Sequence, residues 1–469
     1  MCKLLLSCLM LVAMVSATWA QLDVAKLAQA YKDFDMARNE GKGSSESPDS
    51  STLGWGEGSI IHSYPLMWEA TGDTYWLGQI SRHFRNIMST ATDPDGDGYL
   101  SWQTAVYNCN VAYAERLHNV SVAEIAPDHI KQWAKRDIPN ATGHTYLIEF
   151  QTDAAHFQVR DWDTQELVAE NVEYVDGAAI EQIVPFKFKI TGATHQGDRF
   201  MVRTQPPEPT EFTVHQGMFI YPVALFIEAV KSNPDLQAEF GKDADDFLAF
   251  INKHLFEKNE QDWLEMGELG GAYRFQPLLT DRSPNGIMPH NQYAALGRAW
   301  VVLKDLKGAH PLMADRAEKM VRYFHSFLEL DEDNNAYRWH YSDRIKYGEL
   351  DHSGWEDTSH AALTMSLAVV AARRGLIFTD EDMVRIANTW LKVMWNQDAN
   401  DPKMAAGVDG REPHKFSALL NWWSELSQWD RQVYELAFTC FQAKDEKGQA
   451  VWAPAMLVCA KRAGLELQK

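Results

Sequence analysis

Pairs of apolar helices joined by short turns constrain the fold of this chain more than any other feature. Residues 60–70 and 75–89 carry apolar side chains at helical spacing, and Thr71-Gly72-Asp73 between them is a typical helix stop. The same alternation returns after residue 216, which predicts a mainly α protein and favours an (α/α) toroid or barrel, although no strict repeat is visible. The other expected helices are residues 21–36, 216–231, 243–255, 291–306, 311–328, 359–374, 379–395, 418–424, 428–441 and 451–460.

The residue pattern changes near position 140. Short segments rich in β-branched and aromatic residues follow, broken by Asp, Gly and Pro, and the Pro-rich stretch 205–209 ends the block. We therefore expect a small β-sandwich at residues 141–208, inserted as an accessory module into a helical catalytic domain formed by residues 21–140 and 209–469. Residues 111–118 and 126–134 are expected to be short helices before it. The stretches 145–150 and 197–200 resemble a small β module of flagellar hook-associated proteins.

The first twenty residues have the pattern of a secretory signal peptide. Lys3 precedes an apolar run from Leu4 to Val15, and small residues lead to an expected cleavage before Gln21. The apolar run is too short to span a membrane. The 44 basic and 65 acidic residues give a net charge of −21, which argues against a nucleic-acid partner. We expect a secreted or periplasmic protein without a membrane span.

Tryptophan is unusually frequent, with 17 residues, and several lie in loops beside polar groups. An aromatic ring offers a flat apolar surface that suits the faces of sugars, so the pattern favours carbohydrate binding. A large helical protein also buries many tryptophans for packing alone. The tryptophans in loops are Trp55, Trp102, Trp339, Trp355, Trp422 and Trp423.

Four clusters of ionisable and aromatic residues lie at expected helix starts and loops. They are Trp55, Glu57, His62 and Tyr64; His290, Asn291 and Tyr293; the alternating run from Tyr337 to Tyr341; and Trp355, Glu356, Asp357 and His360. If the last helix already includes Glu356, that residue and His360 share one helix face. A cap at Thr358 or Ser359 would instead leave Glu356 and Asp357 in the preceding loop.

The side chains of these four clusters suit β-elimination at a uronic acid. Removing the C5 proton requires neutralisation of the neighbouring carboxylate, a base for the proton, and an acid for the leaving oxygen. The candidates for neutralisation are Asn291, Arg338 and a protonated Glu356, and those for proton transfer are His290, His360, Tyr293 and Tyr341. The expected substrate contacts are Trp55, Glu57, His62, Tyr64, Trp339, Trp355, Glu356 and Trp422.

Three other functions remain open at this point. Hydrolysis needs two carboxyl groups across the sugar, which Glu57 with Glu356 or Asp357 could supply. A C5-epimerase would share the first step of the elimination without breaking the chain. A glycan-binding protein without catalytic activity would use the same aromatic surface.

We predict no catalytic metal, because the chain has no His-Glu-x-x-His motif and no Cys pair at zinc spacing. Asp93, Asp95 and Asp97 alternate around glycines as in a calcium loop. Thr104 stands where an EF-hand needs Glu, so the segment is either a tight turn or a structural calcium site.

Several motifs together resemble secreted bacterial (α/α)-toroid polysaccharide lyases. They are residues 55–64 and 67–73, Gln216-Gly-Met-Phe-Ile-Tyr-Pro222, the segment 289–298, Glu356-Asp-Thr-Ser-His360 and Phe378-Thr-Asp-Glu-Asp382. The resemblance covers the helical residues and omits the β insert. It implies a lyase that acts on an acidic polysaccharide, alginate or glucuronan. Within it, His290 and Asn291 match the catalytic pair in reversed order, Tyr341 or Tyr293 the proton-transfer tyrosine, and Arg338 the carboxylate contact.

Overall fold

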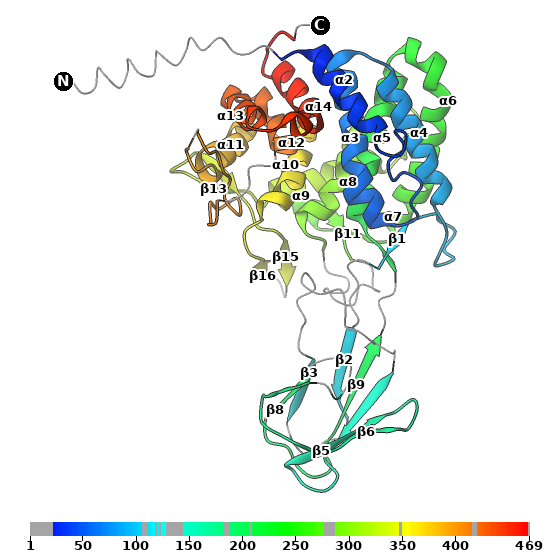
Figure 1. Cartoon of the computed structure of the whole chain (residues 1–469), viewed down its shortest axis with the longest axis vertical. Coiled ribbons are helices and arrows are strands. Elements are labelled where there is room, and N and C mark those ends of the chain that lie inside the picture. The colour runs from blue at the N-terminus through cyan, green and yellow to red at the C-terminus, as the bar shows by residue number, and fades with distance from the viewer. Residues whose placement is uncertain are drawn as a thin grey trace, which may run out of the picture.

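The computed structural model describes residues 22–105, 111–117, 121, 123–127, 144–181, 183, 188–205, 209–275, 287–346, 349–398, 400–414 and 420–467. Most secondary structure in these ranges is helical (Figure 1), which confirms a mainly α protein. The predicted signal peptide and most of the predicted helix 126–134 lie outside the described residues.

The helices divide into two kinds by burial. Every residue of α8 is buried, whereas the buried residues of α9 recur at helical spacing along one face, from Met313 through Ala317 to Phe324. The α-helices are α2 (Val24–Met36), α3 (Gly58–Thr71), α4 (Tyr75–Thr90), α5 (Thr213–Ser232), α6 (Pro234–Phe250), α7 (Lys258–Glu260), α8 (His290–Leu303), α9 (Met313–His325), α10 (Thr358–Ala372), α11 (Asp380–Asn388), α12 (Leu420–Trp423), α13 (Arg431–Gln442) and α14 (Glu446–Arg462). Shorter π or 3-10 segments are η2 (Thr52–Glu57), η3 (Ile251–Glu257), η4 (Gly267–Leu269), η5 (Thr389–Met394) and η6 (Ser424–Gln428).

Buried helices pack against one another in chain order. Helix α5 packs on α3 and α8, α8 packs on α10, and α14 returns to pack on α2 and α3. The contact between α5 and α8 depends on Gly217, where a Cβ atom would come within 2.3 Å of the Ala295 carbonyl carbon. A glycine is therefore required here for the close approach of two helix backbones.

Local capping fixes several helix ends. Gly72 adopts the left-handed conformation after α3, with a φ of 73°, as the predicted glycine stop requires. Thr379 and Asp382 form a reciprocal capping box at the start of α11.

An all-β module lies at one end of the helical body (Figure 1). Its strands form a five-stranded antiparallel sheet in the order β2-β9-β4-β5-β6 and a three-stranded sheet in the order β3-β8-β7. Residues of both sheets, including Ile148, Phe157, Phe188 and Phe200, share one hydrophobic core. The strands are β2 (Val111–Arg116), β3 (Glu124–Pro127), β4 (Thr145–Glu149), β5 (His156–Asp161), β6 (Leu167–Glu173), β7 (Ala179–Ile180), β8 (Phe188–Thr191) and β9 (Arg199–Gln205).

Two predictions about this region are wrong. Val111–Arg116 forms strand β2 instead of a helix, and Glu124–Pro127 forms β3, where the predicted helix 126–134 should begin. Strands β2 and β9 pair along six residues, so the sheet extends before the expected boundary at residue 141. Pairing with a distant strand overrides the helix preference of the alanines in β2. Strands β1 (Gln103–Thr104) and β10 (Thr210–Glu211) pair where the chain leaves and re-enters the helical body.

Small hairpins connect the later helices. They are β11 (Trp263–Glu265) with β12 (Gly271–Tyr273), β13 (Glu329–Asp331) with β14 (Ala336–Arg338), and β15 (Asp343–Lys346) with β16 (Glu349–His352). A turn that includes residues 333–335 joins β13 to β14. An isolated bridge then pairs His340 with Trp355.

Helix α5 is long and apolar enough to cross a membrane by length and composition. However, 83% of its most apolar 18-residue segment is buried in the fold, as expected for a core helix. Among the described residues, it is the one helix that meets both criteria.

Candidate functional site

The starts of four helices come together in the helical body. The ring of Trp55, on η2 before α3, contacts His215 at the start of α5 edge to face, with 5.4 Å between centroids. Gly217 places α5 against the first half of α8. Tyr341 links α8 to α10, because its carbonyl accepts the backbone N–H of His290 at 3.1 Å and its ring lies 5.2 Å from that of His360.

His360 and Asp357 form a dyad at the start of α10. Asp357 is the N-cap, and its carboxylate accepts the backbone N–H groups of Ser359 and His360 and contacts His360 Nδ1. Burial alone would raise the pKa of Asp357, but the bonds from His360 and the backbone lower it below its usual value. The loop alternative for Glu356 is therefore correct, with Asp357 as the cap instead of Thr358 or Ser359. With Nδ1–H donated to the carboxylate, Nε2 of His360 carries the lone pair.

Residues around Tyr341 supply a cation and a flat ring. Arg338 lies half-buried near the end of β14, with its guanidinium carbon 5.4 Å from the centre of the Trp355 ring. Its Nε is 3.8 Å from an Asp331 carboxylate oxygen. Trp355 also stacks on His340, with centroids 4.1 Å apart. Tyr341, Arg338, Trp355 and His360 are all half-buried, so each keeps some access to solvent.

His290 is buried beneath this surface. Its Nε2 lies 2.7 Å from the Asp343 carboxylate and its Nδ1 lies 2.5 Å from the Tyr293 hydroxyl. Burial raises the pKa of Tyr293 well above 10. For Asp343, burial would raise the pKa, but hydrogen bonds and charge from His290 and His352 lower it. His290 and Tyr293, predicted to transfer protons, are therefore placed to hold the Tyr341–Asp343 segment.

Sequence reasoning missed Asp343. It is fully buried and joins His290 on one carboxylate oxygen to the exposed His352 on the other, at 2.7 and 2.5 Å. It follows Tyr341 by two positions, so an extended chain places both on one side, which was an available signal.

Asn291 follows His290 in the first turn of α8. It is 2% exposed, and its Oδ1 has no hydrogen-bond partner among the described residues. A buried amide oxygen without a partner is costly, because it has given up its hydrogen bonds to water.

Glu356 is an acid held inside the protein. It is completely buried and accepts hydrogen bonds from Trp339 Nε1 at 2.5 Å and from Thr364 Oγ1 at 3.0 Å. Burial raises its pKa well above 4.5, so the interior favours the neutral carboxylic acid. The substrate contact expected for Trp339 is wrong in this structure, because Trp339 is completely buried against Glu356.

Two members of the first predicted cluster belong to a separate buried network. Glu57 is fully buried and pairs with Arg38 at 3.0 Å and with His83 at 2.8 Å. Tyr64 donates its hydroxyl proton to Asp35 at 2.6 Å. Neither side chain reaches a surface, so the expected substrate contacts of Glu57 and Tyr64, and a hydrolytic pair of Glu57 with Glu356, do not fit this geometry.

His62 and Trp422 belong to a third group, deeper along α8. The guanidinium of Arg298 is 4.4 Å from the Tyr221 ring centre and 4.5 Å from that of Trp422, and burial lowers its pKa to about 10. His62 stacks on Trp422 with centroids 4.4 Å apart. Arg298 lies eight residues after His290, roughly 12 Å along the helix at about 1.5 Å per residue.

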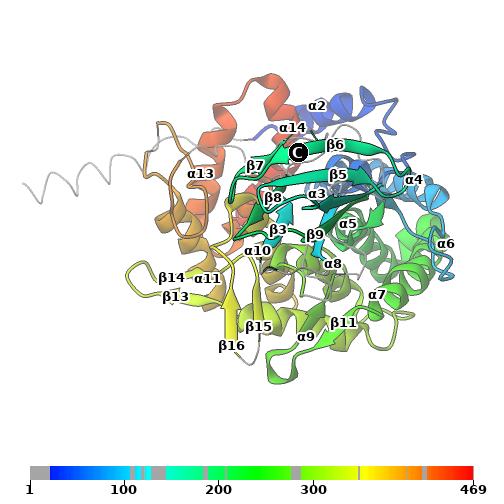
Figure 2. The same cartoon turned by 90° about the horizontal axis from the view of Figure 1, so that it is seen from below.

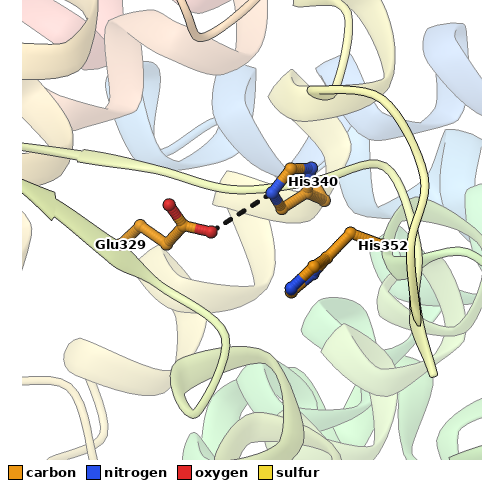
Figure 3. Close-up of side chains that lie close together, drawn as sticks. All are labelled: Glu329, His340 and His352. Atoms are coloured by element: carbon orange, nitrogen blue, oxygen red, sulfur yellow. Dashed lines mark hydrogen bonds and ion pairs between the residues drawn. The ribbon is translucent and has the colours of Figure 1, made fainter. Parts of the chain in front are cut away.

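Two groups of side chains could hold a metal ion. One is Glu329, His340 and His352, whose ligand atoms all lie within 4.8 Å of one another (Figure 3). The other is Asp93, Asp95 and Asp97, with the same limit on separation.

A lysine already occupies the acidic group. Lys258 Nζ lies 2.8 Å from Asp97, 3.2 Å from Asp95 and 3.0 Å from Glu211. Burial alone would lower the pKa of Lys258, but these carboxylates raise it. Lys258 thus serves as a buried internal cation for the turn.

Comparison with known proteins identifies no relative that informs this site. No protein-family model and no curated protein matches the chain. Two crystal structures of Xanthomonas campestris FlgL show a limited similarity over 43% of this chain. One shares 14% identity over 79% of the FlgL chain with a TM-score of 0.16, and the other 13% over 77% with a TM-score of 0.17. Similarity at this level carries no argument about fold or function.

Proposed function

We propose that the helical body is an (α/α) toroid. The supporting observations are the packing of buried helices in the order α3, α5, α8, α10, with α14 returning to α3, and the one-sided burial of α4, α9, α11 and α13. Viewed from below, the helices follow the chain around the body from α4 through α6, α9 and α11 to α13 and α14 (Figure 2). In such a ring the starts of the buried helices face one end.

We propose that this protein is a secreted or periplasmic lyase that cleaves a uronic-acid polymer, alginate or glucuronan, by β-elimination. The observation that carries the proposal is the placement of the His360–Asp357 dyad beside Tyr341 where four helices begin. Arg338 and Trp355 lie in the same segment. These groups match a base, an acid, a cation for a carboxylate and a ring for a sugar face.

The roles follow from access and hydrogen bonding. His360, oriented by Asp357, takes the C5 proton through Nε2, and Tyr341 gives a proton to the leaving oxygen. Arg338 neutralises the uronate carboxylate, so that charge developing at C5 is stabilised. Asn291, with its unpartnered amide oxygen, and Glu356, whose pKa is raised by burial, lie behind this surface.

Helix ends add to the attraction for an acidic chain. Helices α5 and α8 begin without a side-chain cap, so the partial positive charge at each start is not neutralised by a carboxylate of its own. Each helix start contributes roughly 0.3–1 kcal/mol to holding a nearby anion. This local effect favours a uronate despite the overall charge of −21.

Buried His290 acts as a positioning residue in this proposal. Its backbone N–H and Nε2 hold Tyr341 and Asp343, respectively. The reversed His-Asn order relative to the lyases it resembles is consistent with this indirect role.

The test is incubation of the purified protein with mannuronan, alginate and glucuronan while ultraviolet absorbance of the unsaturated product is recorded. We expect His360→Ala and Tyr341→Phe to lower the rate by about 10²–10⁴-fold, the usual contribution of a positioned acid or base. Tyr75→Phe, on the outer helix α4, is the matched control and should keep the wild-type rate.

Each rival predicts a distinct result. New reducing ends without unsaturation would show a hydrolase, and proton exchange at C5 without shortening would show an epimerase. Binding without any turnover, unchanged in Tyr341→Phe, would show a glycan-binding protein and refute the lyase.

We also propose calcium as the ion for the group formed by Asp93, Asp95 and Asp97. Alternating carboxylates are hard oxygen ligands that suit calcium. The ammonium of Lys258 competes for two of them. Lys258→Met should therefore bind calcium more tightly than the wild type in isothermal titration, and equal affinities would contradict the site.

A further inference from the structure

We propose that Glu329, His340 and His352 form a binding site for a zinc-class divalent metal ion. All three come from the segment between α9 and α10: Glu329 begins β13, His340 follows β14, and His352 ends β16. Figure 3 shows the Glu329 carboxylate facing His340, with the ring of His352 close to both. The proposal is independent of the lyase activity proposed above.

The hydrogen bonds of the two histidines leave the correct ring nitrogens for a metal. His340 Nδ1 lies 2.8 Å from the carbonyl oxygen of Ser353, and His352 Nδ1 lies 2.5 Å from Asp343. Because Nδ1 is the donor in each of these two bonds, Nε2 is the nitrogen left for a metal in each ring, and at His340 it faces Glu329 Oε1. Metal-binding histidines are typically held in this way, by a carbonyl or carboxylate on the other ring nitrogen.

The spacing of the ligand atoms also fits. His340 Nε2 lies 3.2 Å from Glu329 Oε1. Two ligands at about 2.0–2.1 Å from a tetrahedral zinc ion are roughly 3.3 Å apart. The two imidazole rings stack with centroids 4.5 Å apart, and the three ligand atoms all lie within 4.8 Å of one another.

The surroundings make this a built site instead of a chance meeting of surface side chains. Trp355 stacks on His340 at 4.1 Å and pairs with it through a backbone bridge. Asp343, which orients His352, is itself fully buried and held by His290. Both histidines are thus fixed before any ion arrives, which lowers the entropy cost of binding.

The donor set selects the class of ion. Two imidazole nitrogens and one carboxylate oxygen suit zinc and similar transition metals, whereas calcium and magnesium prefer oxygen ligands alone. Three protein ligands leave one tetrahedral position for water. The same contacts without a metal would be a simple ion pair between Glu329 and a protonated His340.

The experiment uses the full chain, stripped with a chelator and dialysed. Zinc is then titrated calorimetrically, and cobalt is followed by its visible absorbance, which reports coordination geometry without any enzymatic assay. We expect one ion per chain, and we expect His352→Ala and Glu329→Gln each to weaken binding by at least about tenfold. His195→Ala in the β module is the control and should bind as the wild type does.

Two results would overturn the proposal. One is the absence of stoichiometric zinc binding by the folded wild-type chain. The other is wild-type affinity in both ligand variants. Circular dichroism of each variant separates loss of binding from loss of folding, and Glu329→Gln keeps the test valid if His352→Ala does not fold, because Glu329 lies exposed on a hairpin.

Discussion

Replacing His62 by Phe should reduce the sensitivity of the fold to acid. His62 is 4% exposed, and burial, with the nearby arginines, lowers its pKa from 6.5 to about 4 despite the attraction of Glu425. Since the folded pKa is the lower one, the unfolded chain binds more protons between these values. Stability is therefore lost as pH falls below 6.5 and stops falling near the folded pKa. At about 1.4 kcal/mol per pKa unit, His62 alone accounts for about 3 kcal/mol of that loss.

The assay is urea unfolding, followed by tryptophan fluorescence, at about pH 7 and about pH 4. Phe keeps a flat ring against Trp422, where His62 now stacks at 4.4 Å. The free energy of unfolding should therefore fall by about 3 kcal/mol less between the two pH values in His62→Phe than in the wild type. His195→Gln, on the surface of the β module, is the control and should follow the wild type. Equal losses in His62→Phe and wild type would refute the burial argument.

Two further variants test buried features by unfolding measurements. The wild type should lose stability as pH rises above 4.5, because folding raises the pKa of Glu356 and the unfolded chain ionises it first. Glu356→Gln should not show this loss. Parallel pH profiles of the two proteins would contradict the argument. Gly217→Ala should cost about 1–3 kcal/mol, because its Cβ would meet the backbone of α8. Gly241→Ala, where the nearest atom is 3.8 Å away, should instead stabilise α6 by about 0.5–1 kcal/mol, and similar effects at both glycines would exclude the close-approach explanation.

Helices were predictable because their signals are local. The apolar spacing of residues 75–89 and the stop at Gly72 anticipate α4 and the end of α3 almost to the residue. Strand β2 was not predictable in this way, since its alanines favour a helix and its partner β9 lies some ninety positions later in the chain. The pairing of distant strands leaves no trace in a local window.

The candidate site, too, was predictable only where the signal is local. Sequence position placed His360, Tyr341 and Arg338 at helix starts and loops, and the structure brings Tyr341 and His360 together. The sequence alone could not distinguish accessible side chains from buried ones, so Trp339 and Glu57, which are buried, were expected to contact substrate. Burial depends on how all the helices pack, and a residue of any type can lie inside when its polar atoms find partners.

Asp343 connects the proposed metal site to the proposed catalytic segment, because one carboxylate holds both His352 and His290. In Asp343→Asn, the side-chain amide keeps one acceptor oxygen, so only one of the two histidines retains its bond. If His352 loses its bond, we expect zinc affinity to fall by about 10–100-fold. If His290 loses its bond, we expect the elimination rate to fall, because His290 supports Tyr341. Asp243→Asn, at a buried acid bonded to Ser81, is the matched control. If Asp343→Asn changed neither property in a folded protein, the two sites would not share this carboxylate as an organising group.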